Sequence, residues 1–326
     1  MDNLTHTLAA LALARAGLDR LAPRASLTLV LAANAPDIDV LAAGWGSLAY
    51  LRHHRGVSHS FAGIPVIAGL VVVVVWLLSR RGGASFPWTR AYGLALAGVA
   101  SHLLMDFSNL YGVRPWLPFS PRWYSWDILF IVDVWLWGIL LACLAAPAFG
   151  RLISGEIGAP PGSGRAAAVA GLLLVAGWWT ARDLAHRRAL QMLESHLYAA
   201  DDQPAAPRRV AAFPDPLNPL AWRGLVELEG FHRLLPVHIG RPLDPSAGQV
   251  FYKPDNSAAV EAAAATRTAA EFALFARYRS ASVEPLEDGY RVVFRDFRFL
   301  DGRRNAFVCS IDLDRDLRVR REDFSF

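Results

Sequence analysis

Long apolar runs dominate the first 200 positions of the chain. Phe61–Leu78 holds no charged residue, Ala91–Met105 is a shorter uncharged run, Ile128–Gly150 is interrupted only by Asp133, and Ala166–Thr180 ends in two tryptophans. A helix that spans a membrane needs about 20 predominantly apolar residues. The four runs therefore predict membrane helices, since so many in one part of the chain are not typical of a soluble protein.

The N-terminal apolar segment predicts two short helices. Leu4–Leu31 has the length of one span, but Arg15, Pro23 and Arg24 lie in its middle. Charges are costly at the centre of a bilayer, and proline breaks a helix there. We therefore expect a hairpin of helices over 3–18 and 24–35, which brings the count to about six. No small-residue cleavage site follows it, so a cleavable signal peptide is not expected.

The pattern changes near residue 183. Beyond this residue, the alternation of apolar and polar positions after 289 predicts strands, and Asp301-Gly302 predicts a hairpin turn between two of them. An Ala-rich segment, 261–279, predicts a helix. The fold class is therefore mostly α: a polytopic membrane helical bundle of about six helices over 1–182, an exit helix and Pro-rich linker over 183–219, and a soluble α+β domain over 220–326. The predicted strands are 290–299, 305–313 and 317–324.

The distribution of charged residues also separates the apolar N-terminal part of the chain from the C-terminal part. Residues 1–200 carry 15 Arg and 10 Asp or Glu, whereas residues 201–326 carry 18 Lys or Arg and 19 Asp or Glu. The positive excess lies in short loops of the apolar part and forms no basic stripe, so no nucleic-acid partner is expected. The hydrophobic fraction of 54% excludes a disordered chain, and two cysteines exclude a disulfide framework.

The loop arginines also predict an orientation. If the helices alternate, eight arginines lie at one membrane face and four in the short loops of the other. Arginine-rich loops stay in the cytoplasm. We therefore expect a multi-pass protein of the bacterial cytoplasmic (inner) membrane, with the C-terminal domain outside the cytoplasm and membrane lipids as its surroundings. The sequence leaves the oligomeric state open.

Histidines and aspartates gather at the ends of the apolar segments, at one predicted face. Ionisable groups at that depth are expensive and mark functional sites. Imidazole and carboxylate ligands suit Zn²⁺, with Mn²⁺ or Fe²⁺ as alternatives. The sequence therefore predicts a divalent metal site. The candidate ligands are His6, Asp37, Asp39, His54, His59, His102 and Asp106.

The spacing of these residues supports the site in part. His102 and Asp106 are four apart and share one helix face. Asp37 and Asp39 are two apart, so that one ligates while the other ligates or orients a histidine. Either His54 or His59 supplies a further ligand. The candidate catalytic residues are Asp39, His54 and Arg55, with Arg55 placed to hold an anionic group such as phosphate.

The motifs together resemble those of the bacterial membrane-bound, metal-dependent hydrolases of the YdjM type. The resemblance rests on His6, Pro-Asp-Ile-Asp at 36–39, His-Arg-Gly-Val-Ser-His-Ser at 54–60 and His102…Asp106, and it covers roughly residues 1–150. That family is similar to zinc-dependent phospholipase C and fungal single-strand nucleases, helical enzymes whose zinc clusters cleave phosphodiesters. The resemblance implies as ligands His6, Asp37 or Asp39, His54 or His59, His102 and Asp106.

The chain departs from those soluble enzymes in two respects. It begins Met-Asp where they have a mature N-terminal tryptophan, and neither His186 nor His196 is followed four residues on by a carboxylate. One or two ions are therefore expected in place of three. Asp127 and Asp133 are weaker candidates, with packing roles as an equal alternative.

The sequence thus favours a membrane-embedded hydrolase that uses metal-activated water on phosphoester-type bonds in lipid or envelope substrates. The alternative is a non-catalytic membrane protein with a structural His/Asp metal site and a partner-binding C-terminal domain. A proton-relay transporter is a weaker third hypothesis, because the candidates do not trace a path across the membrane.

Overall fold

The protein is described by a computed structural model over residues 1–80, 85–157, 164–199, 204–254, 258–300 and 307–326, without the side chains of 151–157. It divides into two compact units. A helical unit comprises Met1–Asp39, Arg55–Leu184 and Pro216–Pro219. A second unit comprises Val40–His54, Ala185–Asp215 and Leu220–Phe326. This division differs from the predicted one, because residues 40–54 group with the C-terminal part.

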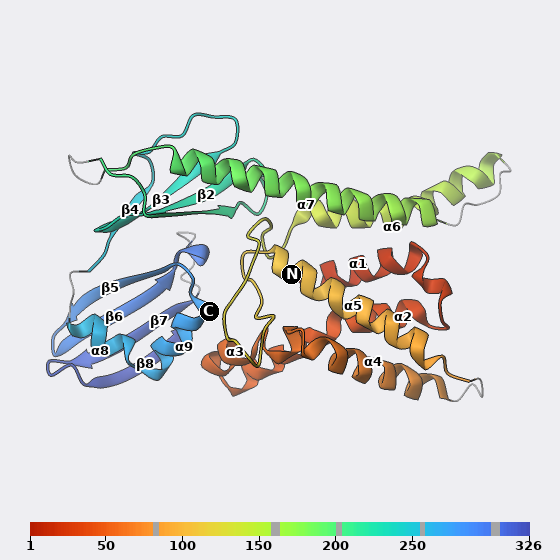
Figure 1. The fold of residues 1–326 in the computed structure, drawn as a ribbon, viewed down its shortest axis with the longest axis horizontal. Helices are drawn as coiled ribbons and strands as arrows, with labels where there is room; N and C mark the ends of the chain where they lie inside the picture. Colours follow the sequence, from red (N-terminus) through yellow and green to blue (C-terminus); the bar gives the residue numbers. More distant parts are fainter. Residues whose placement is uncertain (81–84, 158–163, 200–203, 255–257, 301–306) are drawn as a thin grey trace. The chain divides into compact units, whose positions relative to one another are not determined.

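The N-terminal hairpin is confirmed. Helix α1 (Asn3–Arg15) and helix α2 (Ala25–Asn34) flank a turn that contains a short 3₁₀ helix, Leu18–Arg20 (Figure 1). The Asp2 side chain caps α1 by accepting a hydrogen bond from the Thr5 backbone N–H at 3.0 Å. The polar turn therefore separates two helices, as the charges within the apolar run predicted.

Four longer helices are described: α4 (Gly63–Ser79), α5 (Trp88–Ser108), α6 (Val134–Ile157) and α7 (Arg165–Glu194). All lie in the helical unit except the end of α7, which belongs to the second unit from Ala185 on. Helix α5 packs against α2 and α4 (Figure 1). A Cβ atom at Gly98 would lie 2.7 Å from Ala32 Cβ and 3.0 Å from the Leu29 carbonyl oxygen. The absence of a side chain there lets α5 approach α2 closely.

An irregular segment, 109–133, connects α5 to α6. Val113 and Tyr124 pair across it in an antiparallel bridge, and Asn109 pairs with Leu129 in a parallel one. The Phe61 N–H also donates to the Pro115 carbonyl oxygen at 2.9 Å. These backbone bonds hold the segment beside the start of α4 and the end of α5.

The prediction of about six membrane helices is not supported. Among the described residues, one helical segment, Ala25–Trp45, is long and apolar enough to cross a membrane. A second candidate is the pair Ser47–His59 and Gly63–Ser79, which is bent by 81°. The apolar helix Val134–Gly150 is shorter than a span. With 13 residues, α1 is also too short to cross about 30 Å of hydrocarbon.

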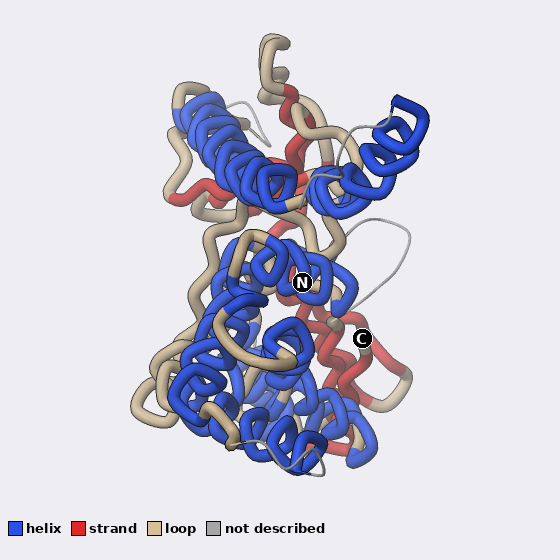
Figure 2. The backbone as a smooth tube through the Cα atoms, turned by 90° about the vertical axis from the view of Figure 1, so that its right-hand side faces the viewer, coloured by secondary structure: helices blue, strands red, loops and turns tan. Residues whose placement is uncertain are grey.

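The second unit contains two antiparallel four-stranded sheets, β1-β2-β3-β4 and β5-β6-β7-β8, whose strands are drawn in red in Figure 2. The end of α7 packs on the first sheet, where Leu193 lies with Trp222 and Val237 in one buried cluster. The strands of the first sheet are β1 (Arg209–Pro214), β2 (Ala221–Glu227), β3 (Phe231–His238) and β4 (Gln249–Tyr252).

The second sheet confirms the three predicted strands and adds β5. Its strands are β5 (Arg279–Leu286), β6 (Gly289–Asp296), β7 (Val308–Asp314) and β8 (Val319–Ser325). The predicted helix over 261–279 is two helices, α8 (Ala258–Ala264) and α9 (Arg267–Phe275), because Thr266 caps a new helix start. The predicted linker contains β1, and the predicted Asp301-Gly302 turn lies outside the described residues.

Helix α3 (Ser47–His53) belongs to the second unit although it lies far from it in sequence. It packs against α9 and β8. Arg52 Nε lies 3.5 Å from Glu271 Oε1, and the Tyr50 and Phe326 rings are 4.7 Å apart. The chain therefore leaves the helical unit after Asp39 and returns to it at Arg55.

Candidate metal centre

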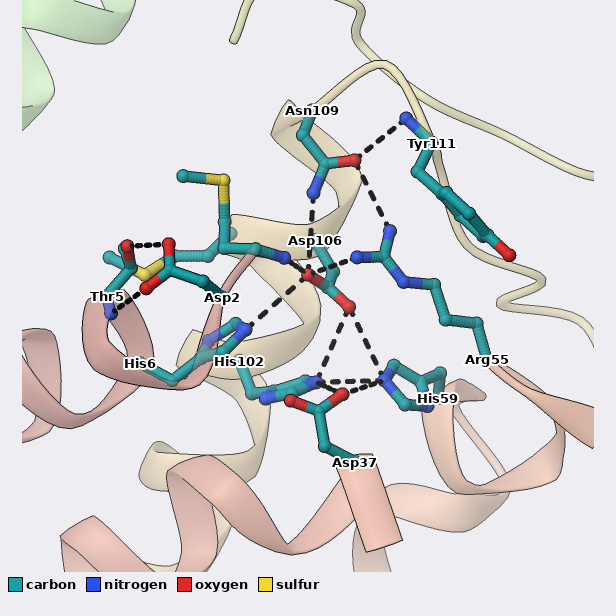
Figure 3. A network of polar contacts seen from close by, with 12 residues as sticks. Asp2, Thr5, His6, Asp37, Arg55, His59, His102, Asp106, Asn109 and Tyr111 are labelled. Atoms are coloured by element: carbon teal, nitrogen blue, oxygen red, sulfur yellow. Dashed lines mark hydrogen bonds and ion pairs between the residues drawn. The ribbon is translucent and has the colours of Figure 1, made fainter. Parts of the chain in front are cut away.

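Four side chains from three parts of the helical unit converge on one point. Asp37 comes from the 3₁₀ helix that follows α2, His59 from the 3₁₀ helix Val57–His59, and His102 and Asp106 from one face of α5 (Figure 3). One ligand atom of each lies within 4.8 Å of all the others. His59, His102 and Asp106 are buried, and the Asp37 side chain is 11% exposed.

The two imidazoles present lone pairs to each other. His102 Nδ1 lies 2.7 Å from the Ala33 carbonyl oxygen, which only accepts hydrogen bonds, so Nδ1 carries the proton. His59 Nδ1 lies 3.0 Å from Asp39 Oδ2 and is assigned its proton by the same argument. The two Nε2 atoms are then both acceptors, yet they lie 2.9 Å apart. A cation bound by both nitrogens would relieve this repulsion.

The carboxylates add two further acceptors. Asp37 Oδ1 and Asp106 Oδ2 each lie 3.4 Å from His59 Nε2, and Asp106 Oδ2 lies 3.5 Å from His102 Nε2. Ligands at about 2.0–2.2 Å from a tetrahedral zinc ion lie about 3.3–3.6 Å apart. The donor set of two nitrogens and two oxygens, and its spacing, therefore fit a divalent ion such as Zn²⁺.

Asp106 is held in place through its other oxygen. Arg55 Nη2 donates to Asp106 Oδ1 at 2.9 Å, while Arg55 Nη1 donates to the Gly112 carbonyl oxygen at 2.8 Å. The same Asp106 oxygen also contacts the Met1 ammonium group and accepts from Asn109 Nδ2 at 3.5 Å (Figure 3). Arg55 has a left-handed φ of 52°, a strained value for a residue with a side chain. This conformation accompanies the buried placement of its guanidinium.

The structure separates the paired candidates. Asp37 and His59 belong to the cluster, whereas Asp39 acts one step away: it accepts from Ser58 Oγ at 2.6 Å and orients His59. His54 lies in the second unit, where its ring stacks on Tyr50 at 4.5 Å. Of the two histidine alternatives, His59 is the one in the four-residue cluster, and the catalytic role of His54 stays a prediction. Arg55 holds Asp106, which differs from the predicted contact with an anionic substrate.

His6 lies beside the cluster without joining its four ligands. Its ring stacks on His102 with 3.8 Å between centroids, and its Nε2 lies 3.5 Å from Asp106 Oδ1. It is fully buried, and neither ring nitrogen forms a hydrogen bond within the described residues. His6 is therefore placed to supply a fifth ligand, or a ligand to a second ion.

The remaining acidic candidates have local roles. Asp133 Oδ1 accepts from the Leu136 N–H at 2.8 Å at the start of α6, and Asp127 Oδ1 accepts from Ser125 Oγ at 2.6 Å. Neither belongs to the cluster. Ser58 and Asn109 were not predicted from the sequence as site residues, although Asn109, at the C-terminal end of α5, follows Asp106 by three residues.

A cavity adjoins the centre at its most exposed ligand. It has a volume of about 460 Å³, and Asp37 forms part of its wall together with residues of α2 and α4. Asp37 Oδ2 makes no hydrogen bond within the described part of the chain. Asp37 therefore faces both the ligand cluster and the cavity.

Two protein families match separate parts of the chain. The YdjM inner membrane protein family matches residues 1–186, and the YfhP C-terminal alpha/beta plait domain matches residues 258–325. A curated relative is the uncharacterized protein YfhP of Bacillus subtilis (strain 168), 26% identical over 153 residues, which are 44% of this chain and 46% of that protein.

The match spans about half the length of that relative, and no solved structure matches the chain. The four cluster residues all lie within the region matched by the first family, which covers more than half of the chain. The chain therefore belongs to the YdjM inner membrane protein family.

Proposed function

We propose that this protein is a membrane-embedded, metal-dependent hydrolase of phosphoester-type bonds in lipid or envelope substrates. The observation that carries the proposal is the convergence of four electron-pair donors, His59, His102, Asp37 and Asp106, with both imidazole Nε2 atoms facing inward. Such a donor set binds zinc, with manganese or iron as alternatives. We place the centre and the C-terminal unit outside the cytoplasm, on the arginine distribution.

The chain's own groups have distinct tasks in this reaction. Asp39 and the Ala33 carbonyl fix the two imidazoles, and Arg55 fixes Asp106. A divalent ion held by His59, His102, Asp37 and Asp106 would lower the pKa of a bound water toward neutrality and would polarise the phosphoryl oxygen. Asp37, the least buried member of the cluster, takes the proton of the attacking water. As the water oxygen bonds to phosphorus, the bond to the leaving oxygen breaks, and that oxygen receives the proton.

Metal analysis of the purified full chain tests the proposal. We expect His102→Ala and Asp106→Ala each to lower bound metal at least about tenfold, since each removes one of four ligands. Both variants should also lose metal-dependent hydrolysis of bis(p-nitrophenyl) phosphate. His53→Ala is the matched control, because His53 is exposed and lies outside the cluster. Undiminished metal in both cluster variants would refute the metal assignment.

A structural metal site is the second candidate, favoured by one specific observation. The cluster offers four protein ligands, three of them buried, and closed four-ligand sites are typical of structural zinc. On this hypothesis the C-terminal unit binds a partner. Metal-loaded protein that hydrolyses no phosphoester probe, yet unfolds at lower temperature after chelation, would favour it over the hydrolase.

A further inference from the structure

The cavity beside the metal centre has one polar end and one apolar wall. Its polar lining comes from Asn3, Asn34 and Asp37. Helix α4 contributes only aliphatic side chains, Ile67, Leu70, Val71 and Val74. Those positions recur at helical spacing, so they form a stripe along α4. The cavity is therefore an amphipathic groove, and one of its polar lining residues, Asp37, also belongs to the ligand cluster.

Asp37 joins the groove to the metal centre. Its Oδ1 lies 3.4 Å from His59 Nε2 within the cluster, while the residue also lines the groove. A molecule in the groove would thus have one end beside the candidate ligands. Small-molecule sites have volumes of about 300–1,000 Å³, and the groove, at about 460 Å³, falls within that range.

The exposed rim of the groove indicates what occupies it. Leu70 is 59% exposed and Val74 is 47% exposed, and both lie on a helix that forms part of a candidate span. In an inner membrane protein such a rim meets hydrocarbon, so a chain enters from the lipid without crossing water. A polar solute would gain nothing from the aliphatic stripe, because it would have to give up hydrogen bonds with water.

We propose that the groove binds the hydrocarbon chain of a lipid phosphoester, and that the chain lies along α4 with its phosphoester at Asp37. This inference rests on the proposed hydrolase function and narrows its substrate class to phosphoesters that carry a hydrocarbon chain. Burial of each methylene in an apolar site favours binding, so chain length controls the specificity.

Two chromogenic probes that differ in chain length test the inference on the full chain in detergent micelles. We expect kcat/KM for hexadecyl p-nitrophenyl phosphate to exceed that for methyl p-nitrophenyl phosphate at least about tenfold. Leu70→Trp, which fills the groove, should lower kcat/KM for the hexadecyl probe at least about tenfold and should change kcat/KM for the methyl probe less than about twofold. Val73→Trp is the control, because Val73 is exposed on α4 but does not line the groove.

Binding separates failure of the groove from failure of the hydrolase. A hexadecyl phosphate with a diazirine in its chain should label α4 residues, and excess hexadecyl phosphate and Leu70→Trp should each suppress the labelling. Such labelling without hydrolysis of either probe would support binding of the hydrocarbon chain in the groove and would refute the proposed hydrolase activity. Labelling that neither competitor nor variant reduces would overturn the groove, as annular lipid contact only. An equal effect of Leu70→Trp on both hydrolysis probes would overturn it as well.

Discussion

At the scale of single residues, the centre depends on groups that do not belong to the four-residue cluster. The Ala33 carbonyl and the Asp39 carboxylate each bind the Nδ1–H of one histidine, and so direct both Nε2 atoms inward. Such outer partners fix the tautomer and raise the basicity of a ligand. Asp39 is the more testable of the two, because a backbone carbonyl cannot be removed by substitution.

We expect Asp39→Asn to weaken metal binding about 10- to 100-fold, the range found when an outer partner of a ligand is lost. Asparagine removes the charge that faces His59 Nδ1 and offers Ser58 a weaker acceptor. Metal competition with a chromogenic chelator measures the affinity. Asp19→Asn, an exposed carboxylate at the hairpin turn, is the matched control. Equal metal affinities for Asp39→Asn and Asp19→Asn would show that Asp39 does not support metal binding through His59.

At the scale of elements, the close crossing of α2 and α5 positions the candidate ligands. Asp37 follows α2, whereas His102 and Asp106 lie on α5, so the distance between these helices sets the distance between ligands. Gly98 sits at this crossing, where a Cβ atom would lie 3.0 Å from the Leu29 carbonyl oxygen. Because that oxygen is backbone, a side chain at 98 is accommodated only if a helix moves.

Gly98→Ala should therefore destabilise the protein by about 1–3 kcal/mol and lower its metal affinity. Gly93→Ala on the same helix has nothing within 4 Å of the added Cβ, so it should be neutral or stabilising by up to about 1 kcal/mol. Thermal unfolding in detergent, with and without chelator, compares the two. A similar loss in both variants would indicate that general damage to α5 is the cause.

Strand β7 provides a probe of the second unit. Burial of Cys309, with smaller contributions from Glu322 and Asp323, raises the pKa of its thiol from its ordinary value of about 9 to about 12. The folded protein thus keeps the thiol protonated, and this contribution to stability is present below about pH 9 and lost as the pH rises toward 12.

We expect Cys309 to resist maleimide at pH 8 in the native protein and to react after denaturation, because the thiolate is the nucleophile. Peptide mass mapping distinguishes it from Cys143, which is also a free cysteine. Rapid native labelling at Cys309 would contradict the packing of β7 against its neighbours.

At the scale of the whole molecule, residues 40–54 tie the two units together through the chain. They pack with the C-terminal elements, while Asp39 and Arg55, at their two ends, orient His59 and Asp106. The orientation predicted from the arginine-rich loops concerns the whole chain too, and it stays a prediction.

A C-terminal alkaline phosphatase fusion should be active, because this reporter folds only outside the cytoplasm and the C-terminal unit is predicted to lie there. A fluorescent protein fused at the same position should be dark for the same reason. The reverse pattern would place the C-terminal unit in the cytoplasm and overturn the predicted orientation. Fusions after Leu21, in the basic turn, should give the opposite result to the C-terminal ones.

The sequence by itself determined what depends on local geometry. Charges within an apolar run fixed the hairpin of α1 and α2, alternation fixed β6, β7 and β8, and the four-residue spacing put His102 and Asp106 on one helix face. Each of these follows from the repeat of a helix or strand, which needs no distant contact. Strand β1 was missed even so, because the prolines around it favoured a linker, and β2, β3 and β4 were not predicted individually within the α+β domain.

Only the tertiary structure decided between neighbours in loops. Asp37 and Asp39, like His54 and His59, are equivalent in composition, and the path of the chain alone sends Asp37 and His59 into the cluster. The same path takes His54 and residues 40–54 into the second unit. No repeat fixes where a loop side chain points, so its role is set by contacts with residues far away in the sequence, such as Ala33, Arg55 and Asn109.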